Sequence, residues 1–351
     1  MATPRVACPR ILSTAATIAT AVALAMAGCY FSGPVDRAVT GDEELLEFAR
    51  QHYTEAWHRV AVAVIDGDDV RTGFVTADSS TMFELGIASR VLTGELLARG
   101  IELGEVSLDD PIGAHLALGD SPVASITLRQ LATHHSGLPE HPMDPEFRDP
   151  DMLGVEGMLE IAAGVIPQQS PGYHLGGDLD AALVGQVLAT AAGVGYADLL
   201  EERVLEPAAM EDAVVMEATD LLPAALAQGH DRLGVQMPSR GHGPYAPATG
   251  VAVTMDDMIA LAKAVIAGPV SESKALEPIS DTIWPETRIG YFWEIEDRPE
   301  GELAYVVGWS PGFSCALLVD RRDDEAAILL SNVHDTWPWG PATELLEIVE
   351  D

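Results

Sequence analysis

The strand-like segments of this sequence lie near its two ends, with a helix-rich region between them. Val60 to Ile65 and Val70 to Val75 are β-favouring runs on either side of Asp66–Asp69, which predicts a β-hairpin with a longer loop. Segments from about 109 to 267 are mostly helical and separated by Gly and Pro, and strand patterns return only after Ile289. We therefore predict one sheet assembled from both ends of the chain, with a helical region inserted between them.

The length and composition fit this architecture. The chain has 351 residues, of which 48% are hydrophobic, enough for one large domain or two intimate subdomains. Asp42 is suited to cap a helix, and residues 88–103 form an amphipathic helical pattern. We predict a domain over 42–351, with a sheet subdomain at about 42–108 and 251–351 and a helical subdomain at about 109–250.

The N-terminus has the layout of a secretory signal peptide. Ile11 to Met26 carries no charge, and the small residues of Ala27-Gly28-Cys29 resemble a bacterial lipobox. We predict a signal peptide over 1–28, lipidation of Cys29 and a tether over 29–41. The alternatives are a plain transmembrane anchor and a coincidental cysteine. With either kind of anchor, the domain is expected outside the cytoplasm, held at the bacterial cell membrane.

The charge of the chain limits its partners. Its formal charge is −36, and removal of residues 1–28 takes away only Arg5 and Arg10, which makes it −38. This excess of acidic residues excludes nucleic acid as a partner, because phosphate binding needs clustered Lys and Arg. If Cys8 leaves with the signal peptide and Cys29 is lipidated, Cys315 remains alone, so we expect no disulfide. We expect no cofactor and no metal, since no histidine and carboxylate set has a convincing ligand spacing.

The stretch Gly308–Gly312 reads G-W-S-P-G and matches the G-x-S-x-G pattern of a hydrolase nucleophile elbow. That elbow requires a sharp turn from a strand into a helix. Here the following segment, Phe313 to Asp320, is a short β-favouring run. The context is strand, turn, strand, which argues against Ser310 as an elbow serine.

Several segments together resemble the serine β-lactamase and penicillin-binding protein superfamily, in particular its class C and D,D-peptidase-like branch, over about Val60 to Asn332. Phe83–Gly86 reads F-E-L-G where the family has F-E-I-G. Ile126–Pro139 is close to I-T-L-R-D-L-L-T-H-T-S-G-L-P, the most specific match. The resemblance implies an α/β (α+β) fold: an antiparallel sheet flanked by helices, an inserted all-helical subdomain, and a site in the cleft between them.

The family transfers acyl groups to a serine at a helix N-terminus, activated by a lysine one turn later. In this sequence that cluster reads Ile87-Ala88-Ser89-Arg90. Isoleucine has no nucleophile, and Arg90 stays protonated near neutral pH, so it is a poor base. Ser89 lies two residues further on, which turns its side chain by about 200 degrees around the helix, away from Ile87. The only lysines, Lys263 and Lys274, are far along the chain.

The family's second cluster is Tyr-x-Asn, where the phenol helps to move protons and the amide holds substrate. The resemblance aligns Gly176 with the tyrosine and Asp178 with the asparagine. Tyr173 and His174 are nearby candidates for a substitute, although local surface roles are commoner for both.

The third cluster is a strand with His-Asn-Gly or Lys-Thr-Gly. It aligns with Val306, Val307 and Gly308, so the cation or imidazole is absent. Trp309 replaces a glycine that gives close approach, and Ser310 is predicted in the turn that follows.

Two other matches favour structural roles. Ser271–Lys274 satisfies S-x-x-K literally, but it lies far from the F-E-L-G segment and is predicted to be a solvated loop. His134 and His135 belong to the I-T-L-R segment, and we expect structural hydrogen bonding from them.

The sequence therefore favours a family member without acyl-transfer chemistry, retained as a binding or regulatory lipoprotein. Its cleft would be partly closed by Ile87, Val306 and Trp309. The alternative is an active serine hydrolase that uses Ser89 or Ser310 beside a base such as His174 or Asp178. Partners could be a peptidoglycan peptide or an envelope protein. The residues predicted to line the ligand cleft are Tyr173, His174, Asp178, Trp309 and Ser310.

Overall fold

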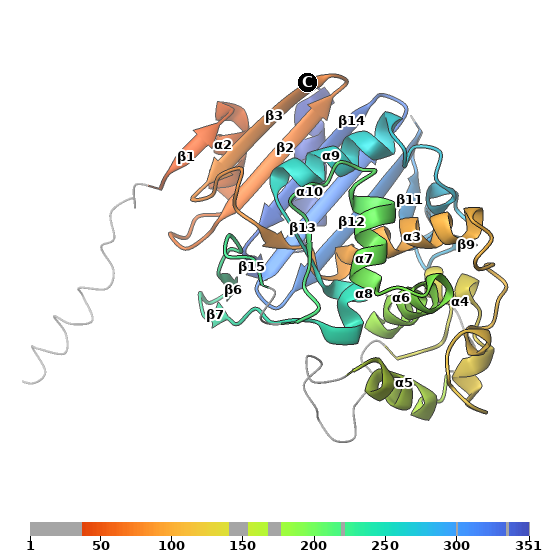
Figure 1. Cartoon of the computed structure of the whole chain (residues 1–351). Coiled ribbons are helices and arrows are strands. Elements are labelled where there is room, and N and C mark those ends of the chain that lie inside the picture. Colours follow the sequence, from red (N-terminus) through yellow and green to blue (C-terminus); the bar gives the residue numbers. More distant parts are fainter. Residues whose placement is uncertain are drawn as a thin grey trace, which may run out of the picture. The chain divides into compact units, whose positions relative to one another are not determined.

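The computed structural model describes residues 37–139, 154–167, 177–218, 222–299, 301–334 and 337–350, and the unit discussed below is Ala38–Asp351. Within these residues nine strands form one antiparallel sheet (Figure 1). In spatial order they are β1 (Val39–Gly41), β3 (Asp69–Val75), β2 (Val60–Asp66), β14 (Glu325–Ser331), β13 (Phe313–Asp320), β12 (Glu302–Ser310), β11 (Glu294–Asp297), β10 (Thr287–Ile289) and β9 (Ser280–Asp281). The predicted sheet from both chain ends is confirmed, because β2 pairs with β14.

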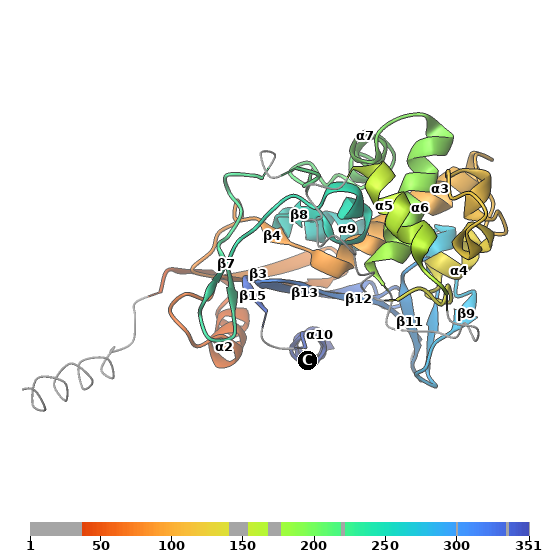
Figure 2. The same cartoon turned by 90° about the horizontal axis from the view of Figure 1, so that it is seen from below.

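Successive side chains along the central strands point to opposite faces of the sheet, and both faces are apolar. Val60, Val62 and Val64 of β2 point into one apolar cluster, while Ala61 and Ala63 point into another. The first cluster is covered by α2 (Glu43–His52) and α10 (Trp339–Glu350). The second lies under α9 (Met255–Ala267) and the helical region (Figure 2). The result is a sheet with helices on both faces.

The hairpin that joins β2 and β3 is tighter than predicted. Asp66 pairs with Asp69, so only Gly67 and Asp68 form the turn. Gly67 has φ +55°, a left-handed conformation that glycine adopts without strain and that two-residue hairpin turns require. The expected longer loop was therefore wrong, because the strands extend into the acidic residues.

The central region surrounds a buried helix, α6 (Asp178–Ala192), which packs against α3 (Arg90–Glu102). Its other helices are α4 (Leu128–Ala132), α5 (Val155–Gly164), α7 (Tyr196–Leu200) with a π turn (Glu201–Leu205), α8 (Ala246–Thr249), and the 3-10 turns η2 (Ile112–Ala114), η3 (Pro122–Ser125) and η7 (Gly243–Tyr245). Thr127 and Gln130 form a capping box at the start of α4, which gives the I-T-L-R segment a structural role. Within the described part of the chain no single helix could cross a membrane by length and hydropathy, and α6 with Tyr196–Leu205 qualifies only as a pair bent by 84°.

Short strands also occur before Ile289, several of them within the region predicted to be mostly helical. One three-stranded sheet contains β4 (Phe83–Glu84), β8 (Val251–Val253) and β5 (Val214–Val215), and another contains β15 (Val333–His334), β6 (Gly229–Asp231) and β7 (Gln236–Met237). The expectation that strands return only after Ile289 was wrong, because two or three residues are too few to show an alternating pattern.

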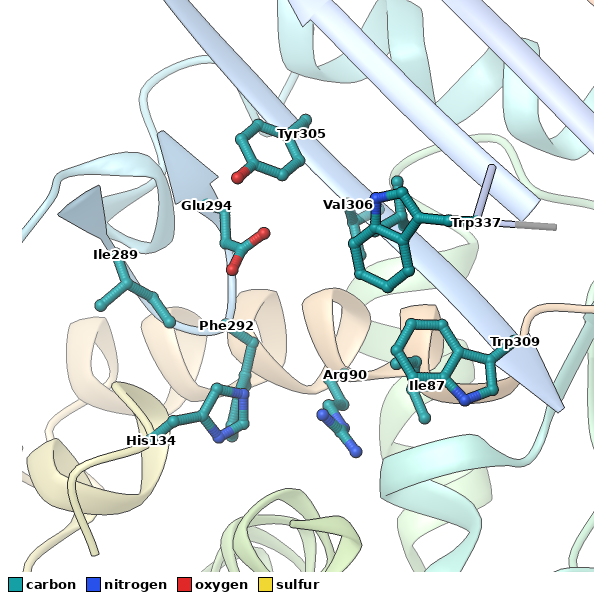
Figure 3. A pocket seen from close by; sticks show the side chains of 11 residues that line it. Ile87, Arg90, His134, Ile289, Phe292, Glu294, Tyr305, Val306, Trp309 and Trp337 are labelled. Atoms are coloured by element: carbon teal, nitrogen blue, oxygen red, sulfur yellow. The ribbon is translucent and has the colours of Figure 1, made fainter. Parts of the chain in front are cut away.

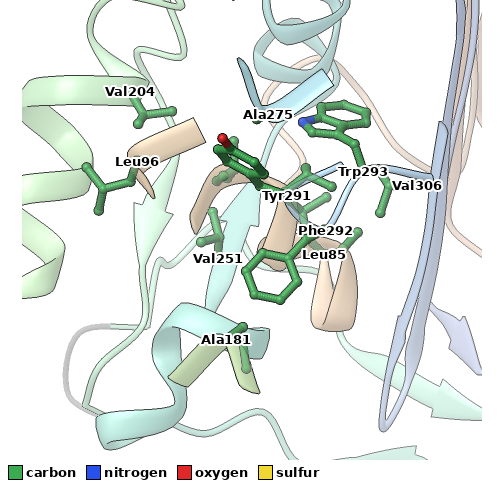
Figure 4. Packing of buried hydrophobic residues seen from close by; sticks show 14 of the residues in the cluster. Leu85, Leu96, Ala181, Val204, Val251, Ala275, Tyr291, Phe292, Trp293 and Val306 are labelled. Carbon is green, nitrogen blue, oxygen red and sulfur yellow. The ribbon is translucent and has the colours of Figure 1, made fainter. Parts of the chain in front are cut away.

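The core continues from the sheet into the helical region. Trp293 and Phe83 are among its largest fully buried side chains. Figure 4 shows Trp293 near Val306 of β12, and Ala181 of α6 in the same cluster. The helix that begins at Arg90 is thus fixed between the sheet and α6. It begins with a 3-10 turn, η1 (Gly86–Ser89), instead of the regular helix predicted from residue 88.

Candidate ligand cleft

The turn η1 lies in backbone contact with strand β12. Gly86 has φ +53°, and a Cβ atom at this residue would be 2.1 Å from the carbonyl oxygen of Trp309. A Cβ on Gly308 would be 2.5 Å from the carbonyl oxygen of Leu85. Because real Cβ atoms do not approach backbone so closely, both positions require glycine. This contact places residues 87–90 beside the Val306–Val307–Gly308 segment.

The first cluster presents the apolar side chain of Ile87, which the resemblance aligns with the family's nucleophile. Ile87 lines a pocket between η1, β12 and β10 (Figure 3). Ser89 is fully buried, and its Oγ accepts a hydrogen bond of 3.1 Å from the backbone N–H of Val251. Ser89 therefore contacts β8 instead of the pocket, and its side chain points away from that of Ile87 as predicted.

The second cluster meets the first through an ion pair. Arg90 Nη2 donates to Asp178 Oδ1 at 2.8 Å, and the two side chains are 9% and 23% exposed. Asp178 is the first residue of α6, where a carboxylate is favoured by the helix dipole. The two residues that the resemblance aligns with the family's lysine and asparagine thus form an ion pair. Tyr173, His174 and Gly176 lie outside the described residues.

A buried hydrogen-bond network lies beside this ion pair. Asp180 Oδ2 is 3.0 Å from His134 Nδ1, and Asp180 Oδ1 accepts from Ser136 Oγ at 2.6 Å. Burial above all, with the charges of Arg90 and His135, lowers the pKa of His134 well below its usual range. His134 is therefore a neutral imidazole at neutral pH. Sequence reasoning expected structural hydrogen bonding from His134 but missed Asp180, which lies 46 residues away in the chain.

The third cluster lies on β12, and Ser310 does not point into the pocket. Ser310 is the last residue of β12, one position earlier than the predicted turn, which is formed by Pro311 and Gly312. Its Oγ donates to Glu84 Oε2 at 2.7 Å, and the residue is 3% exposed. Burial, opposed by hydrogen bonds from Ser239 and Ser310, raises the pKa of Glu84. The chain passes from β12 through this turn into β13, so it does not form an elbow.

The pocket is small and mostly apolar and aromatic. The space that solvent can occupy in it is about 60 Å³, below the about 300–1,000 Å³ that small-molecule sites usually offer. Ile87, Val306 and Trp309 all line it. The other lining residues are Arg90, His134, Ile289, Phe292, Glu294, Tyr305, Val307 and Trp337. Sequence reasoning missed Glu294, Tyr305 and Trp337, because they belong to none of the three motifs.

Comparisons with known proteins agree with this geometry. The β-lactamase family model matches residues 49–346. The chain therefore belongs to the β-lactamase family of serine hydrolases, which includes penicillin-binding proteins.

Curated relatives are distant. A β-lactamase-like protein of Arthroderma benhamiae is 24% identical over 259 residues, which are 62% of this chain and 42% of that protein. The D-alanyl-D-alanine-carboxypeptidase/endopeptidase AmpH of Escherichia coli K12 is 27% identical over 177 residues, 46% of each chain. The chain thus matches less than half the length of either relative.

Solved structures establish the fold. A class C β-lactamase has a TM-score of 0.74 at 16% identity, with 88% of this chain and 95% of that chain covered. A D-stereospecific amidohydrolase from Streptomyces sp. has a TM-score of 0.75 at 16% identity, with 86% and 97% covered. A penicillin-binding protein from Bacillus halodurans has a TM-score of 0.69 at 19% identity, with 82% and 96% covered. The predicted family and fold class are confirmed.

Proposed function

We propose that this protein is a non-catalytic member of its family that has a binding or regulatory role. The observation that carries the proposal is the Arg90–Asp178 ion pair beside Ile87. A serine nucleophile needs a neighbouring group that can accept its proton. An arginine paired with a carboxylate remains protonated, so these positions hold neither a nucleophile nor a base.

The two alternative serines are poorly suited to act as nucleophiles. Ser89 is fully buried against Val251, and Ser310 is buried against Glu84. An attacking oxygen must reach a carbonyl carbon held at about 3–3.5 Å. A substrate could contact either serine only after the packing around η1 and β12 had opened.

Hydrolysis assays test the proposal. We expect no turnover above background of a chromogenic cephalosporin, a p-nitrophenyl ester or a D-alanyl-D-alanine peptide. The Ser310→Ala and Ser89→Ala variants control for a contaminating hydrolase, because contaminant activity is the same in all three preparations. Turnover by the parent protein that either variant abolishes would contradict the proposal and identify the nucleophile.

We further propose that the protein is a lipoprotein of the bacterial cell envelope, anchored through Cys29, and that its partner is a peptidoglycan peptide or an envelope protein. The uncharged Ile11–Met26 segment followed by Ala27-Gly28-Cys29 supports the anchor. Expression in bacteria with labelled palmitate should give a labelled, membrane-associated protein. The Cys29→Ser variant should lose both label and membrane association, and equal labelling of the two would contradict the anchor.

A further inference from the structure

The β6–β7 hairpin presents two apolar side chains to solvent at its tip. Residues 232–235 join the two strands, and within them Leu233 is 79% exposed and Val235 is 57% exposed. Large apolar side chains that gather on one exposed feature indicate an interaction site, whereas single ones are ordinary on a protein surface. The tip is therefore a candidate contact surface outside the cleft.

The tip has a fixed shape. Asp231 Oδ1 accepts hydrogen bonds from the backbone N–H groups of Leu233 at 2.8 Å and Val235 at 2.9 Å. Gly234 has φ +79°, and a Cβ atom on it would be 3.0 Å from the ring of Trp57, so this ring supports the turn from behind. The two apolar side chains are thus presented without the entropy loss of ordering a loose loop on contact.

The hairpin lies at the end of the sheet where the chain enters the described unit. One row of paired residues crosses four strands at this end: Val39, Val75, Val60 and Ser331. Because neighbouring strands are about 4.8 Å apart, this row is about 15 Å long. Asn332, the next residue, donates from Nδ2 to the carbonyl oxygens of Trp57 at 3.2 Å and of Gln228, directly before β6, at 2.7 Å. Figure 1 and Figure 2 both show β1 and the hairpin on the same side of the unit.

This end of the sheet is close in sequence to the proposed lipid anchor. Ten positions separate Cys29 from Val39, and ten residues span at most about 36 Å. A lipid on Cys29 would therefore keep this end of the sheet within that distance of the bilayer. A tethered surface meets its target at a high effective concentration, so a weak contact is sufficient to hold it there.

Two arginines lie near the hairpin in a strongly acidic chain. Arg232 at the tip is exposed, and so is Arg59, whose backbone N–H donates to Asn332 Oδ1 at 2.7 Å. Among the described residues neither arginine side chain forms an ion pair. Guanidinium groups bind phosphate, which lipid head groups carry. These two side chains reduce the repulsion that a formal charge of −36 imposes near an anionic lipid surface.

From this placement we propose that the β6–β7 tip docks on the surface of the lipid bilayer. Leu233 and Val235 enter the boundary between head groups and acyl chains, and Arg232 and Arg59 contact the head-group phosphates. The inference rests on the proposed function, because it requires the lipid anchor at Cys29. Two apolar side chains bind a bilayer only weakly by themselves, so the docking depends on the tether.

Fluorescence quenching by brominated lipids tests the docking in the full-length lipoprotein, reconstituted in phosphatidylcholine vesicles. An NBD label is attached at Gln236→Cys, an exposed position of β7 that leaves Leu233 and Val235 intact. The matched control is Ser125→Cys in η3, an exposed position of the helical region. This turn contacts α5, which lies on the side of the unit away from the hairpin (Figure 1, Figure 2). Cys315 is buried, so it is not expected to take up label.

We expect the label at position 236 to lose fluorescence in vesicles with brominated acyl chains, relative to vesicles without bromine. The label at position 125 should lose none. Equal loss at the two positions would overturn the proposal, as would the absence of loss at both.

Variants assign the contact to the tip. Leu233→Ser combined with Val235→Ser should abolish the loss of fluorescence at position 236. Ile283→Ser changes a side chain that is 56% exposed, next to the strand β9 at the opposite edge of the sheet from β1, and should leave the loss unchanged. An unchanged thermal transition shows that each variant is folded. Unaltered quenching in the folded double variant would contradict the assignment.

Failure of the docking and failure of the proposed function give different results. Flotation with the vesicles reports the anchor, so a protein that does not float lacks the lipid, and the docking proposal fails with it. A protein that floats without quenching at position 236 retains the anchor and removes only the docking. Turnover that depends on Ser89 or Ser310 would remove the non-catalytic role without affecting the quenching.

Discussion

The segment formed by η1 and the start of α3 has two sides, which differ in the side chains that they can accommodate. On one side Gly86 and Gly308 bring the turn into backbone contact with β12, and this side retains the family's F-E-L-G segment and the glycine of the third motif. On the other side Ile87 and Arg90 face the pocket, and both depart from the family. The contact with β12 admits only glycine at Gly86 and Gly308, whereas the pocket side places no such backbone requirement on Ile87 and Arg90. The residues on the pocket side can therefore vary more than the two glycines without loss of the fold.

The largest effect is expected where the contact is tightest. Gly86→Ala would place a Cβ 2.1 Å from a backbone oxygen at φ +53°, while Gly67→Ala would place one at φ +55° with no atom within 4 Å. A left-handed alanine costs about 1–2 kcal/mol, and forced repacking adds about 1–3 kcal/mol. We expect denaturant unfolding to show that the free energy of unfolding falls by about 4 kcal/mol in Gly86→Ala and by about 1 kcal/mol in Gly67→Ala. Equal losses would show that the β12 contact can relax.

Further along α3, Glu95 is buried and makes no ion pair with any of the described residues. Glu95 accepts a hydrogen bond from Trp293 Nε1 at 2.7 Å. Burial, opposed by hydrogen bonds from Ser273 and Trp293 and by the charge of Arg321, raises the pKa of Glu95 to about 7. Since its unfolded value is 4.5, the stability contribution of the protonated group is complete below pH 4.5 and is lost as pH rises to about 7.

Glu95→Gln tests this pH dependence, because the amide can still accept from Trp293. Between pH 4.5 and 8 the free energy of unfolding of the parent protein should fall by on the order of 3 kcal/mol more than that of Glu95→Gln. This difference follows from the rise of the Glu95 pKa from 4.5 to about 7. Thermal or denaturant unfolding at each pH provides the measurement. Glu102→Gln, at an exposed position on the same helix, should follow the parent. Identical pH profiles for Glu95→Gln and the parent would refute the burial argument.

A smaller effect is expected at the ion pair on the pocket side. Asp178→Asn removes the charge that pairs with Arg90, and we expect the free energy of unfolding to fall by about 2 kcal/mol. Breaking a fully buried pair costs about 3–5 kcal/mol, and the effect is smaller here because Asp178 is partly exposed. Glu102→Gln, which affects the exposed pair Arg99–Glu102, should cost about 0.3 kcal/mol. A double-mutant cycle with Arg90→Met measures the coupling. Coupling of Arg90 with Asp178 no larger than that of Arg99 with Glu102 would show that the pair contributes little.

The sequence predicted the parts of the structure that depend on long repeated patterns. Strands such as β2 and β13 have seven or eight residues, enough for sheet faces to be recognised. The helical offset between Ile87 and Ser89 also predicted which of them lines the pocket. The Arg90–Asp178 contact joins residues 88 positions apart, and no local pattern encodes it. Glu294 and Trp337 were not predicted to line the pocket. They belong to segments that are separate in the sequence, and no local pattern shows that these segments lie side by side in the fold.

The most direct test of a cleft without acyl-transfer chemistry is the intact mass of the purified domain, from about Phe31 onward, after incubation with a fluorophosphonate and separately with a penicillin. We expect an unchanged mass in both reactions, from protein shown to be folded by its thermal transition. A stoichiometric adduct mapped to Ser89 or Ser310 would contradict it and would establish an active serine outside the family's usual position.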